Sequence, residues 1–237
     1  MTDVLKHKNL PQVLYEDDDI LVINKPPGLL SSPDGYNSDL PHLRSVLEPH
    51  FGKLWMVHRL DKETSGTILL AKNAAAHRIM NASFRSNQVK KTYHGLVTPA
   101  PDWQDIAIDF LLLVNADRKH RTRVNPENGK EAHSDCKVLK RFALGALLEI
   151  QIQTGITHQI RAHLRACNLM LLGDVLYGSG LPSSPITVSR TMLHARAIAF
   201  QHPIIGTWMT FSASYFDDFR DAYTKLRVTT TPDVMLL

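Results

Sequence analysis

Cysteine is scarce in this sequence: the chain of 237 residues holds only Cys136 and Cys167. Two cysteines cannot build a zinc site from cysteine ligands alone, and such low usage is typical of proteins from a reducing compartment. The 12 histidines do not suggest a metal site either, because His158 and His163 stand five apart and no His-Glu-x-x-His pattern occurs. We therefore expect no disulfide, no metal ion and a cytoplasmic location.

Long hydrophobic runs are also missing. Phe110–Val114 is one of the longest, whereas a helix that crosses a membrane needs about 20 apolar residues. The composition, with 43% hydrophobic and 21% charged residues and no low-complexity tract, is that of an ordinary globular protein. We therefore expect no membrane association and a single domain over residues 1–237, with its core at about residues 13–225.

Net charge gives little guidance, because an excess of +4 is small for a chain of this length. The basic residues are nevertheless unevenly placed: Arg118, Lys119, Arg121 and Arg123 fall within one short run, and Arg161 and Arg165 are four apart. Solvated faces explain such spacing as well as contacts with a polyanion do, so composition alone leaves both interpretations open.

Apolar spacing predicts more strands than helices. Alternating Leu148, Ile150 and Ile152 indicate a half-buried strand. Further strands are expected at 20–23, 55–57, 66–71, 91–97, 193–200 and 208–213, helices near 40–47, at 73–87 and from Thr157, and a hairpin at 125–129. Because strands often follow one another directly, the pattern predicts an α+β fold on a mixed, mostly antiparallel sheet with flanking helices.

The polar segment Val57–Gly66, which interrupts two of these strands, is the most informative part of the chain. It reads Val-His-Arg-Leu-Asp-Lys-Glu-Thr-Ser-Gly. Such a loop could simply be a turn in which Asp61 accepts backbone N–H bonds. Ser65, His58 and Asp61 also suggest a serine hydrolase, but three triad members in one loop rarely reach the required geometry and no Gly-x-Ser-x-Gly pattern is present.

This segment resembles the active-site motif of the RluA-type pseudouridine synthases. The resemblance extends in order over nearly the whole chain, through the pieces Tyr15–Ser32, Lys90–Tyr93, Gly129–Lys130, Thr154–His163, Leu172–Asp174, Tyr177–Gly178, Leu193–Ala195 and His202–Pro203. It implies the pseudouridine synthase fold with a central catalytic cleft. It also implies an isomerase that needs no cofactor and converts uridines in RNA into their C-linked isomer.

By this resemblance Asp61 is the essential catalytic residue. The reaction breaks the bond from N1 to C1′ and rejoins the base through C5, so the sugar carbon becomes electron-poor. A carboxylate can attack C1′ as a nucleophile or remove the C2′ proton to give a glycal, and the sequence leaves both routes open.

Two more catalytic residues follow from the resemblance. Arg161 matches a basic residue that pairs with the catalytic carboxylate, and Tyr93 matches a tyrosine that stacks on the target base and assists proton removal from C5. In isolation, Arg161 would be read as a surface residue and Tyr93 as a packing residue. The chain departs from the family where Ile156 replaces a usual arginine, which puts in doubt a contact made there but leaves Arg161 in register.

RNA binding is assigned in the same way. Arg59 matches an arginine that enters the space left by the flipped nucleotide. A simple contact between Arg59 and a phosphate explains the residue nearly as well. Arg118, Lys119, Arg121 and Arg123 are expected to contact the RNA backbone. The first strand begins by about residue 13, so we expect no N-terminal S4 RNA-binding domain.

The expected partner is structured RNA, a ribosomal or transfer RNA stem-loop, bound by a monomer with no obligate protein partner. The sequence does not identify the uridine. The alternative is a non-catalytic RNA-binding or RNA-chaperoning protein of the same fold, which would have no need for an ionised carboxylate facing a phosphate-rich ligand.

Overall fold

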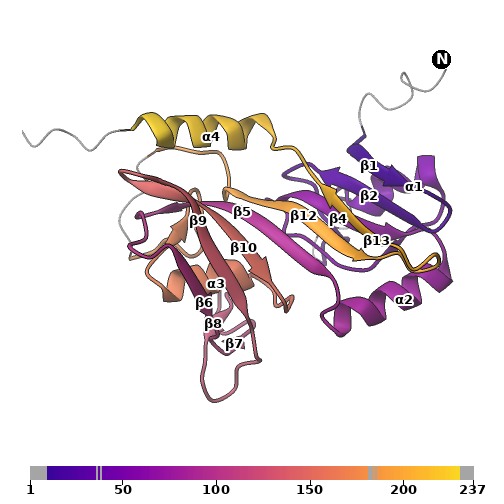
Figure 1. The fold of residues 1–237 in the computed structure, drawn as a ribbon, viewed down its shortest axis with the longest axis horizontal. Coiled ribbons are helices and arrows are strands. Elements are labelled where there is room, and N and C mark those ends of the chain that lie inside the picture. The colour runs from indigo at the N-terminus through magenta and orange to yellow at the C-terminus, as the bar shows by residue number, and fades with distance from the viewer. Residues whose placement is uncertain (1–9, 36, 38, 181–183, 185, 230–237) are drawn as a thin grey trace, which may run out of the picture. The chain divides into compact units, whose positions relative to one another are not determined.

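The computed structural model describes residues 10–35, 37, 39–180, 184 and 186–229 (Figure 1). The chain forms two compact units. The first comprises residues 1–89 and 195–214, and the second comprises residues 90–194 and 215–237. Each unit has its own sheet strands, helices and hydrophobic core, and each is described by itself. The single catalytic domain expected from the sequence stays a prediction.

Mostly antiparallel pairings form the sheet of the first unit. Their order is β1-β2-β4-β12, with β3 paired to β4 and β13 paired to β12. The strands are β1 (Gln12–Glu16), β2 (Ile20–Lys25), β3 (Trp55–Met56), β4 (Ser65–Ala71), β12 (Leu193–Gln201, whose first two residues belong to the second unit) and β13 (Trp208–Ser212). Every residue of β2 and β4 is buried, so both faces of this central pair are covered.

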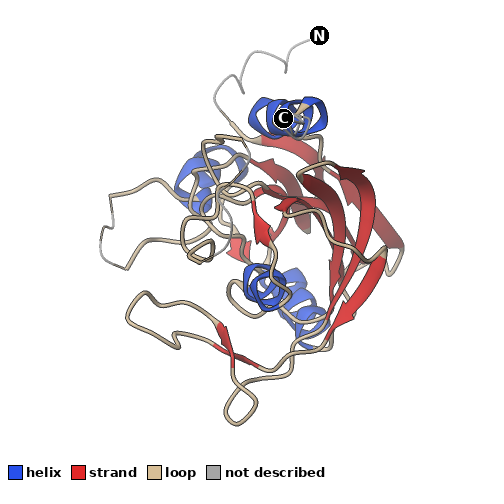
Figure 2. Ribbon diagram, turned by 90° about the vertical axis from the view of Figure 1, so that its left-hand side faces the viewer, coloured by secondary structure: helices blue, strands red, loops and turns tan. Residues whose placement is uncertain are grey.

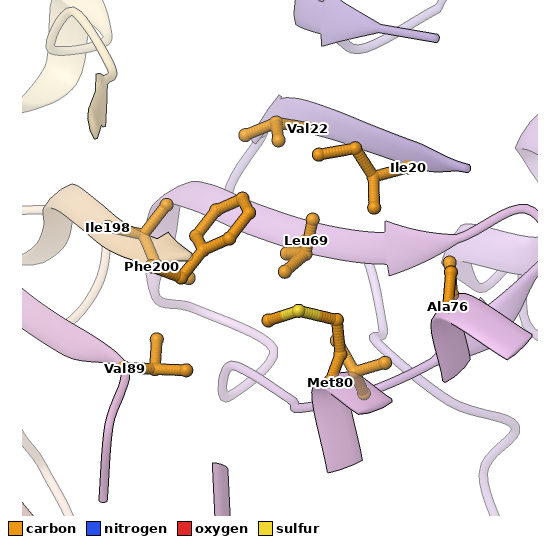
Figure 3. Packing of buried hydrophobic residues seen from close by; sticks show 10 residues of the cluster. Ile20, Val22, Leu69, Ala76, Met80, Val89, Ile198 and Phe200 are labelled. Atoms are coloured by element: carbon orange, nitrogen blue, oxygen red, sulfur yellow. The ribbon is translucent and has the colours of Figure 1, made fainter. Parts of the chain in front are cut away.

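Two helices complete the first unit, α1 (Leu43–Phe51) and α2 (Ala74–Arg85). Asn73 caps α2, since its side-chain oxygen accepts the backbone N–H of Ala76 at 2.9 Å. Figure 3 shows Met80 of α2 pointing toward the strands that carry Leu69 and Phe200. This apolar contact fixes α2 on the sheet and forms the core of the unit.

The second unit is built on a four-stranded antiparallel path in the order β5-β10-β9-β6, with β11 added to β5. These strands are β5 (Lys90–Thr98), β6 (Asp105–Ile108), β9 (Ser134–Phe142), β10 (Gly145–Ile152) and β11 (Met170–Leu171). A separate hairpin pairs β7 (Leu112–Leu113) with β8 (Arg123–Val124). Figure 2 draws its two short strands in red and its long loops in tan.

The helices of the second unit are α3 (Gln159–Ala166) and α4 (Asp217–Val228). The buried face of α4, which includes Phe219 and Leu226, packs on Leu96 of β5 and Leu147 of β10. A salt bridge from Arg190 to Asp218, 2.6 Å between Nε and Oδ2, holds the start of α4. Burial opposes ionisation of Asp218, but the hydrogen bond and charge of Arg190, together with the N–H of Phe219 and the charge of His194, outweigh it and lower the pKa of this carboxyl.

The α+β class and the mostly antiparallel sheet predicted from the sequence are confirmed, together with the strands near 20–23, 66–71, 91–97, 148–152, 193–200 and 208–213. The strand expected to begin by about residue 13 is β1, whereas the sequence patterns did not predict β6, β9, β11 or α4. Helix α3 begins at Gln159 rather than Thr157, because His158 adopts a left-handed φ of 57° that a helix cannot include. The predicted turn at Asn125–Gly129 is present: the side-chain oxygen of Asn125 accepts the N–H groups of Glu127 and Asn128.

Among the described residues, none of the helices combines the length and the apolar character that crossing a membrane requires.

Candidate active site

The loop that carries Asp61 lies between β3 and β4 and is fastened to the turn after β2. The ammonium group of Lys25 is fully buried and donates to the main-chain oxygens of Pro26, Leu29 and Lys62 at 3.0, 2.8 and 3.1 Å. The N–H of Gly28 donates to the same oxygen of Lys62 at 2.8 Å. The Lys-Pro-Pro-Gly turn therefore clamps the residue that follows Asp61.

Ser31 fastens the other side of the loop. Its hydroxyl donates to the carbonyl of Leu60 at 2.7 Å and accepts the N–H of Leu60 at 3.0 Å. The residue before Asp61 is thus held through both of its peptide groups, and the residue after it is held by Lys25. Buried main-chain groups that are fully bonded in this way make a loop rigid.

Gly66 and Thr67 connect the loop to the sheet. A β-carbon at Gly66, whose φ is +114°, would lie 2.2 Å from the carbonyl oxygen of Ala195 on β12. Only glycine fits so close to a neighbouring strand at this backbone angle. The hydroxyl of Thr67 donates to the same oxygen at 3.1 Å. The Thr-Ser-Gly end of the motif therefore lets the end of the loop pack directly against β12.

Asp61 itself is half-buried, between exposed Arg59 and exposed Lys62. Its main-chain oxygen accepts the N–H of Thr64 at 3.1 Å, which closes the turn. The backbone of the loop thus forms the turn that the plainer interpretation expected, while the residue as a whole keeps partial access to solvent. A reacting group must be reachable by its substrate, and Asp61 meets that condition.

The serine hydrolase interpretation fails on the same loop. His58 accepts the N–H of Leu69 on its Nε2 at 2.9 Å, and its ring stacks on Phe84 with centroids 4.7 Å apart. Ser65 is fully buried. A histidine engaged with the main chain and a serine shielded from solvent cannot act as base and nucleophile.

Tyr93 lies on β5 in the second unit, opposite Ile150 of β10, and its side chain is buried. Two residues earlier, Lys91 is also buried and donates to the carbonyls of Gln153 and Thr154, at 3.1 Å each. Burial lowers the pKa of Lys91 to about 8. Lys91 therefore ties the strand that carries Tyr93 to the turn before α3.

Arg161 occupies the first part of α3. Its Nε and Nη2 donate to the two carboxylate oxygens of Asp174, both at 2.7 Å, and its guanidinium lies over the ring of Tyr177 at 4.9 Å from the centroid. Asp174 is buried and also accepts the N–H groups of Leu176 and Tyr177. This bidentate pair fixes the plane of the guanidinium.

The turn at 154–159, which sets where α3 begins, is closed by Gln159. Its side-chain oxygen accepts the hydroxyl of Thr154 at 2.8 Å and the N–H of Ile156 at 3.1 Å. Ile156 packs against an apolar cluster that includes Leu112 and Ala162. At the position where the resemblance implied an arginine, this chain therefore makes a hydrophobic contact.

The basic run 118–123 is less open than the sequence suggested. Arg121 and Arg123 both donate from Nε to Oδ2 of Asp117, at 2.7 and 3.0 Å. Burial alone would raise the pKa of Asp117, but these bonds and the N–H groups of Lys119 and Arg121 lower it to about 2. Arg118 and Lys119 are exposed. One carboxylate thus orients two of the four predicted RNA-binding cations.

The predicted site residues are divided between the two units. Asp61 and Arg59 belong to the first unit, whereas Tyr93, Arg161 and the basic run 118–123 belong to the second. The sequence patterns gave no role to Lys25, Lys91, Asp117 or Asp174, although each stands inside or beside a quoted motif. The roles of Lys25, Lys91 and Asp174 rest on contacts with main-chain oxygens or with residues far along the chain, which spacing does not reveal, whereas Asp117 pairs with Arg121 and Arg123 close by in the chain.

Asp17, Asp19 and His202 gather in the first unit, with potential ligand atoms within 4.8 Å of one another. The carboxylate of Asp17 already accepts the hydroxyl of Tyr15, the N–H groups of Asp19 and Ile20, and a bond shared with Nε2 of His202 at 2.9 Å. These contacts explain the group as an anchor between the turn after β1 and the turn after β12.

A family model described as RNA pseudouridylate synthase matches residues 19–166, more than half of the chain. The "Uncharacterized RNA pseudouridine synthase" of Aquifex aeolicus (strain VF5) is 35% identical over 94% of this chain and 75% of its own length. The "Dual-specificity RNA pseudouridine synthase RluA" of Escherichia coli (strain K12) is 33% identical over 88% of this chain and 97% of its own length.

A solved structure has a similar fold. "Human RNA Pseudouridylate Synthase Domain Containing 4" superposes with a TM-score of 0.73 and 25% sequence identity, and the match covers 91% of this chain and 93% of that one. The likeness therefore extends over nearly all of both chains.

Proposed function

Since the chain belongs to the RNA pseudouridylate synthase family, we propose that it modifies particular uridines of ribosomal or transfer RNA with Asp61 as the essential residue. The chain is an isomerase that converts uridine in RNA to pseudouridine. The roles of individual residues, the kind of RNA and the way it is held are the substance of the proposal.

The chemistry defines what the site must do. The bond between N1 and C1′ breaks, the base turns, C5 bonds to C1′, and the proton lost from C5 is balanced by one gained at N1. Asp61 either bonds to C1′ and is later displaced, or takes the C2′ proton and returns it. Both routes need an ionised carboxylate in a fixed position, and both return it unchanged.

The observation that carries the proposal is the way the Asp61 loop is held. Lys25, Gly28 and Ser31 fasten the residues on both sides of Asp61, while Asp61 itself stays half-buried. Fixing a backbone on both sides of one partly exposed carboxylate is the arrangement that catalysis by positioning requires. A protein that only binds RNA gains nothing from it.

Arg161 and Tyr93 are the proposed partners of Asp61. Arg161 keeps the carboxylate ionised and oriented, and Asp174 acts as a positioning residue by fixing the guanidinium of Arg161. Tyr93 stacks on the uracil and assists removal of the C5 proton. We propose that the three residues act on the same nucleotide, in the catalytic cleft that the family resemblance implies.

RNA binding is proposed to combine extrusion of the target nucleotide with phosphate contacts. Arg59, exposed two residues before Asp61, fills the space left by the flipped uridine. Arg118, Lys119, Arg121 and Arg123 contact the backbone of a structured stem-loop. The proposed working form is a cytoplasmic monomer without an obligate protein partner.

The decisive experiment is incubation of the purified protein with RNA from cells that lack its gene, followed by mapping of pseudouridine at single-nucleotide resolution. Wild-type protein should restore pseudouridine at defined positions. Asp61→Asn should restore none while still binding RNA, because it removes the charge and keeps the shape. Glu63→Gln, which alters an exposed carboxylate of the same loop, should remain active.

Binding of RNA without any pseudouridine formed by wild-type protein would favour the non-catalytic alternative. Equal activity of wild-type protein and Asp61→Asn would contradict the role of Asp61 while leaving the reaction class intact.

A further inference from the structure

A pocket of about 470 Å³ opens in the second unit beside α3. Its walls come from β8 and the residues before it, from the later turns of α3, and from the segment at 177–179; the lining residues are Arg121, Thr122, Arg123, Val124, Ala162, Arg165, Ala166, Tyr177 and Ser179. The charged side chains among them are all arginines. This lining points to an anionic ligand.

Two of the three arginines are held in place by one carboxylate. Asp117 receives the Nε–H groups of Arg121 and Arg123 on the same oxygen, and its other oxygen receives the N–H groups of Lys119 and Arg121. Asp117 neutralises one of the three positive charges. The pocket therefore keeps an excess of two positive charges, with two guanidiniums already oriented before a ligand arrives.

Arg165 supplies the third guanidinium from the opposite wall. It lies four residues, or about 6 Å along the axis, after Arg161 on α3. Its Nη2 donates to the carbonyl of Ser179 at 3.2 Å, and this hydrogen bond holds the Arg165 side chain against the segment at 177–179. A guanidinium has five N–H donors and matches the geometry of a phosphate group.

Tyr177 decides what kind of ligand fits. The guanidinium of Arg161 lies over its ring, the ring of His158 meets it edge-on with centroids 5.7 Å apart, and its hydroxyl accepts the N–H of Thr122 at 2.8 Å. Both the ring and the hydroxyl of Tyr177 are thus engaged, so it is poorly placed to stack on a nucleobase. The pocket has the features of a phosphate site rather than a base site.

We infer that this pocket binds a backbone phosphate of the RNA substrate, at a nucleotide next to the one that reacts, with Arg165 as its central contact. The inference rests on the proposed function, because it assumes that Arg161, one turn earlier on α3, acts at the reacting nucleotide. No bond is made or broken in this step. The phosphodiester exchanges its counterions for the guanidiniums.

The test measures RNA affinity, kcat and KM for wild-type protein, Arg165→Ala and Arg165→Lys over a series of salt concentrations. Arg165→Ala should weaken RNA binding about tenfold and reduce the slope of log affinity against log salt by about one, since one phosphate contact is lost. KM should rise and kcat should stay within about twofold. Arg165→Lys should restore the slope and only part of the affinity, because lysine cannot bind a phosphate through two parallel bonds.

Arg141→Ala is the matched control. Arg141 belongs to the same unit, is exposed, and donates from Nη2 to the carbonyl of Trp103 at 2.9 Å, as Arg165 does to Ser179. It does not line the pocket. Arg141→Ala should leave affinity, slope and KM at wild-type values, and the unfolding midpoint of each variant should match that of wild-type protein.

Other outcomes overturn the inference. If Arg165→Ala binds RNA as Arg141→Ala does, or lowers kcat with KM unchanged, the pocket does not hold a substrate phosphate. Displacement of RNA by micromolar inorganic phosphate at constant ionic strength would identify a small-anion site instead. The main readout is RNA affinity, which does not depend on catalysis. RNA binding without pseudouridine formation would therefore contradict the proposed function, yet the affinities of the variants would still show whether the pocket holds an RNA phosphate.

Discussion

The buried ammonium group of Lys25 donates a hydrogen bond to the main-chain oxygen of Lys62 at 3.1 Å, 37 residues further along the chain. This single contact joins the Lys-Pro-Pro-Gly turn to the residue that follows Asp61. Two motifs that are separate in the sequence therefore act together to hold the Asp61 loop in place. A charged hydrogen bond sealed from water is stronger than one at the surface, so it can set the position of the loop.

Lys25→Met should therefore destabilise the protein and impair the reaction. Three main-chain oxygens lose their charged donor, for which we expect a fall of about 2–4 kcal/mol in the free energy of unfolding. Loosening of the Asp61 loop should lower kcat about a hundredfold, because small misplacement of a catalytic group has effects of this size. Denaturant unfolding and single-turnover kinetics measure the two effects.

Lys72→Met is the control for Lys25→Met. Lys72 also donates to a main-chain oxygen, that of Asp17 at 2.6 Å, and pairs with Glu16 at 2.7 Å, but away from the Asp61 loop. Lys72→Met should lower the free energy of unfolding by less than about 1 kcal/mol and leave kcat unchanged. Equal kinetic effects of the two substitutions would contradict the role given to Lys25.

Asp174→Asn should weaken the protein through the buried ion pair with Arg161. The side chain of Asp174 is 1% exposed, and losing its charge leaves the guanidinium without its bidentate partner. Removing one member of a buried pair costs about 3–5 kcal/mol. Asp217→Asn breaks the pair with Arg220, whose side chains are 85% and 57% exposed, and should change stability by less than about 1 kcal/mol.

Thermal and denaturant unfolding of the two variants compare the pairs directly. We also expect kcat to fall at least tenfold in Asp174→Asn and not in Asp217→Asn, since only the former orients Arg161. A stable and fully active Asp174→Asn would show that the guanidinium needs no such support.

Tyr93→Phe should separate stacking from proton removal. Phenylalanine keeps the ring, so RNA affinity should stay within about twofold of wild type, whereas loss of the hydroxyl should lower kcat about a hundredfold or more. Tyr223→Phe, on α4, where the ring contacts Phe142 of β9, is the control and should be fully active. Normal kcat in Tyr93→Phe would limit the residue to stacking and packing.

Lys91 should make stability depend on alkaline pH. Its pKa is about 8 in the folded protein because of burial, against an ordinary value of 10.5. Between these pH values the unfolded chain holds a proton that the folded protein lacks, so the free energy of unfolding rises as pH rises from 8 to 10.5. The gap between the two values corresponds to about 3 kcal/mol.

Unfolding of wild-type protein and Lys91→Met, measured from pH 7 to pH 10, isolates this contribution, because all other groups titrate in both proteins. The difference between the two curves should grow above pH 8. Lys90→Met, which changes the exposed neighbouring lysine, should follow the wild-type curve. Parallel curves for wild type and Lys91→Met would refute the lowered pKa.

The sequence predicted those helices and strands that are specified by side chains close together in the chain. The capping of α2 by Asn73 and the strands at β2, β4 and β10 follow from side-chain chemistry and apolar spacing close by in the chain. Strand β9 was missed because it lies half in solvent, with burial that depends on a neighbouring strand. Helix α4 was missed although its buried residues Phe219, Ala222 and Leu226 follow helical spacing, a local signal that could have predicted it.

The sequence by itself determined the family and the reaction and led to the proposal that Asp61 is essential, because ordered motifs preserve chemical identity whatever the chain does in space. Only the tertiary structure decided how those residues are held: Lys25 on the carbonyl of Lys62, Asp174 on Arg161, and Asp117 between Arg121 and Arg123. The first two contacts join residues 37 and 13 positions apart in the sequence, and their strength comes from exclusion of water, which exists only once the chain has folded.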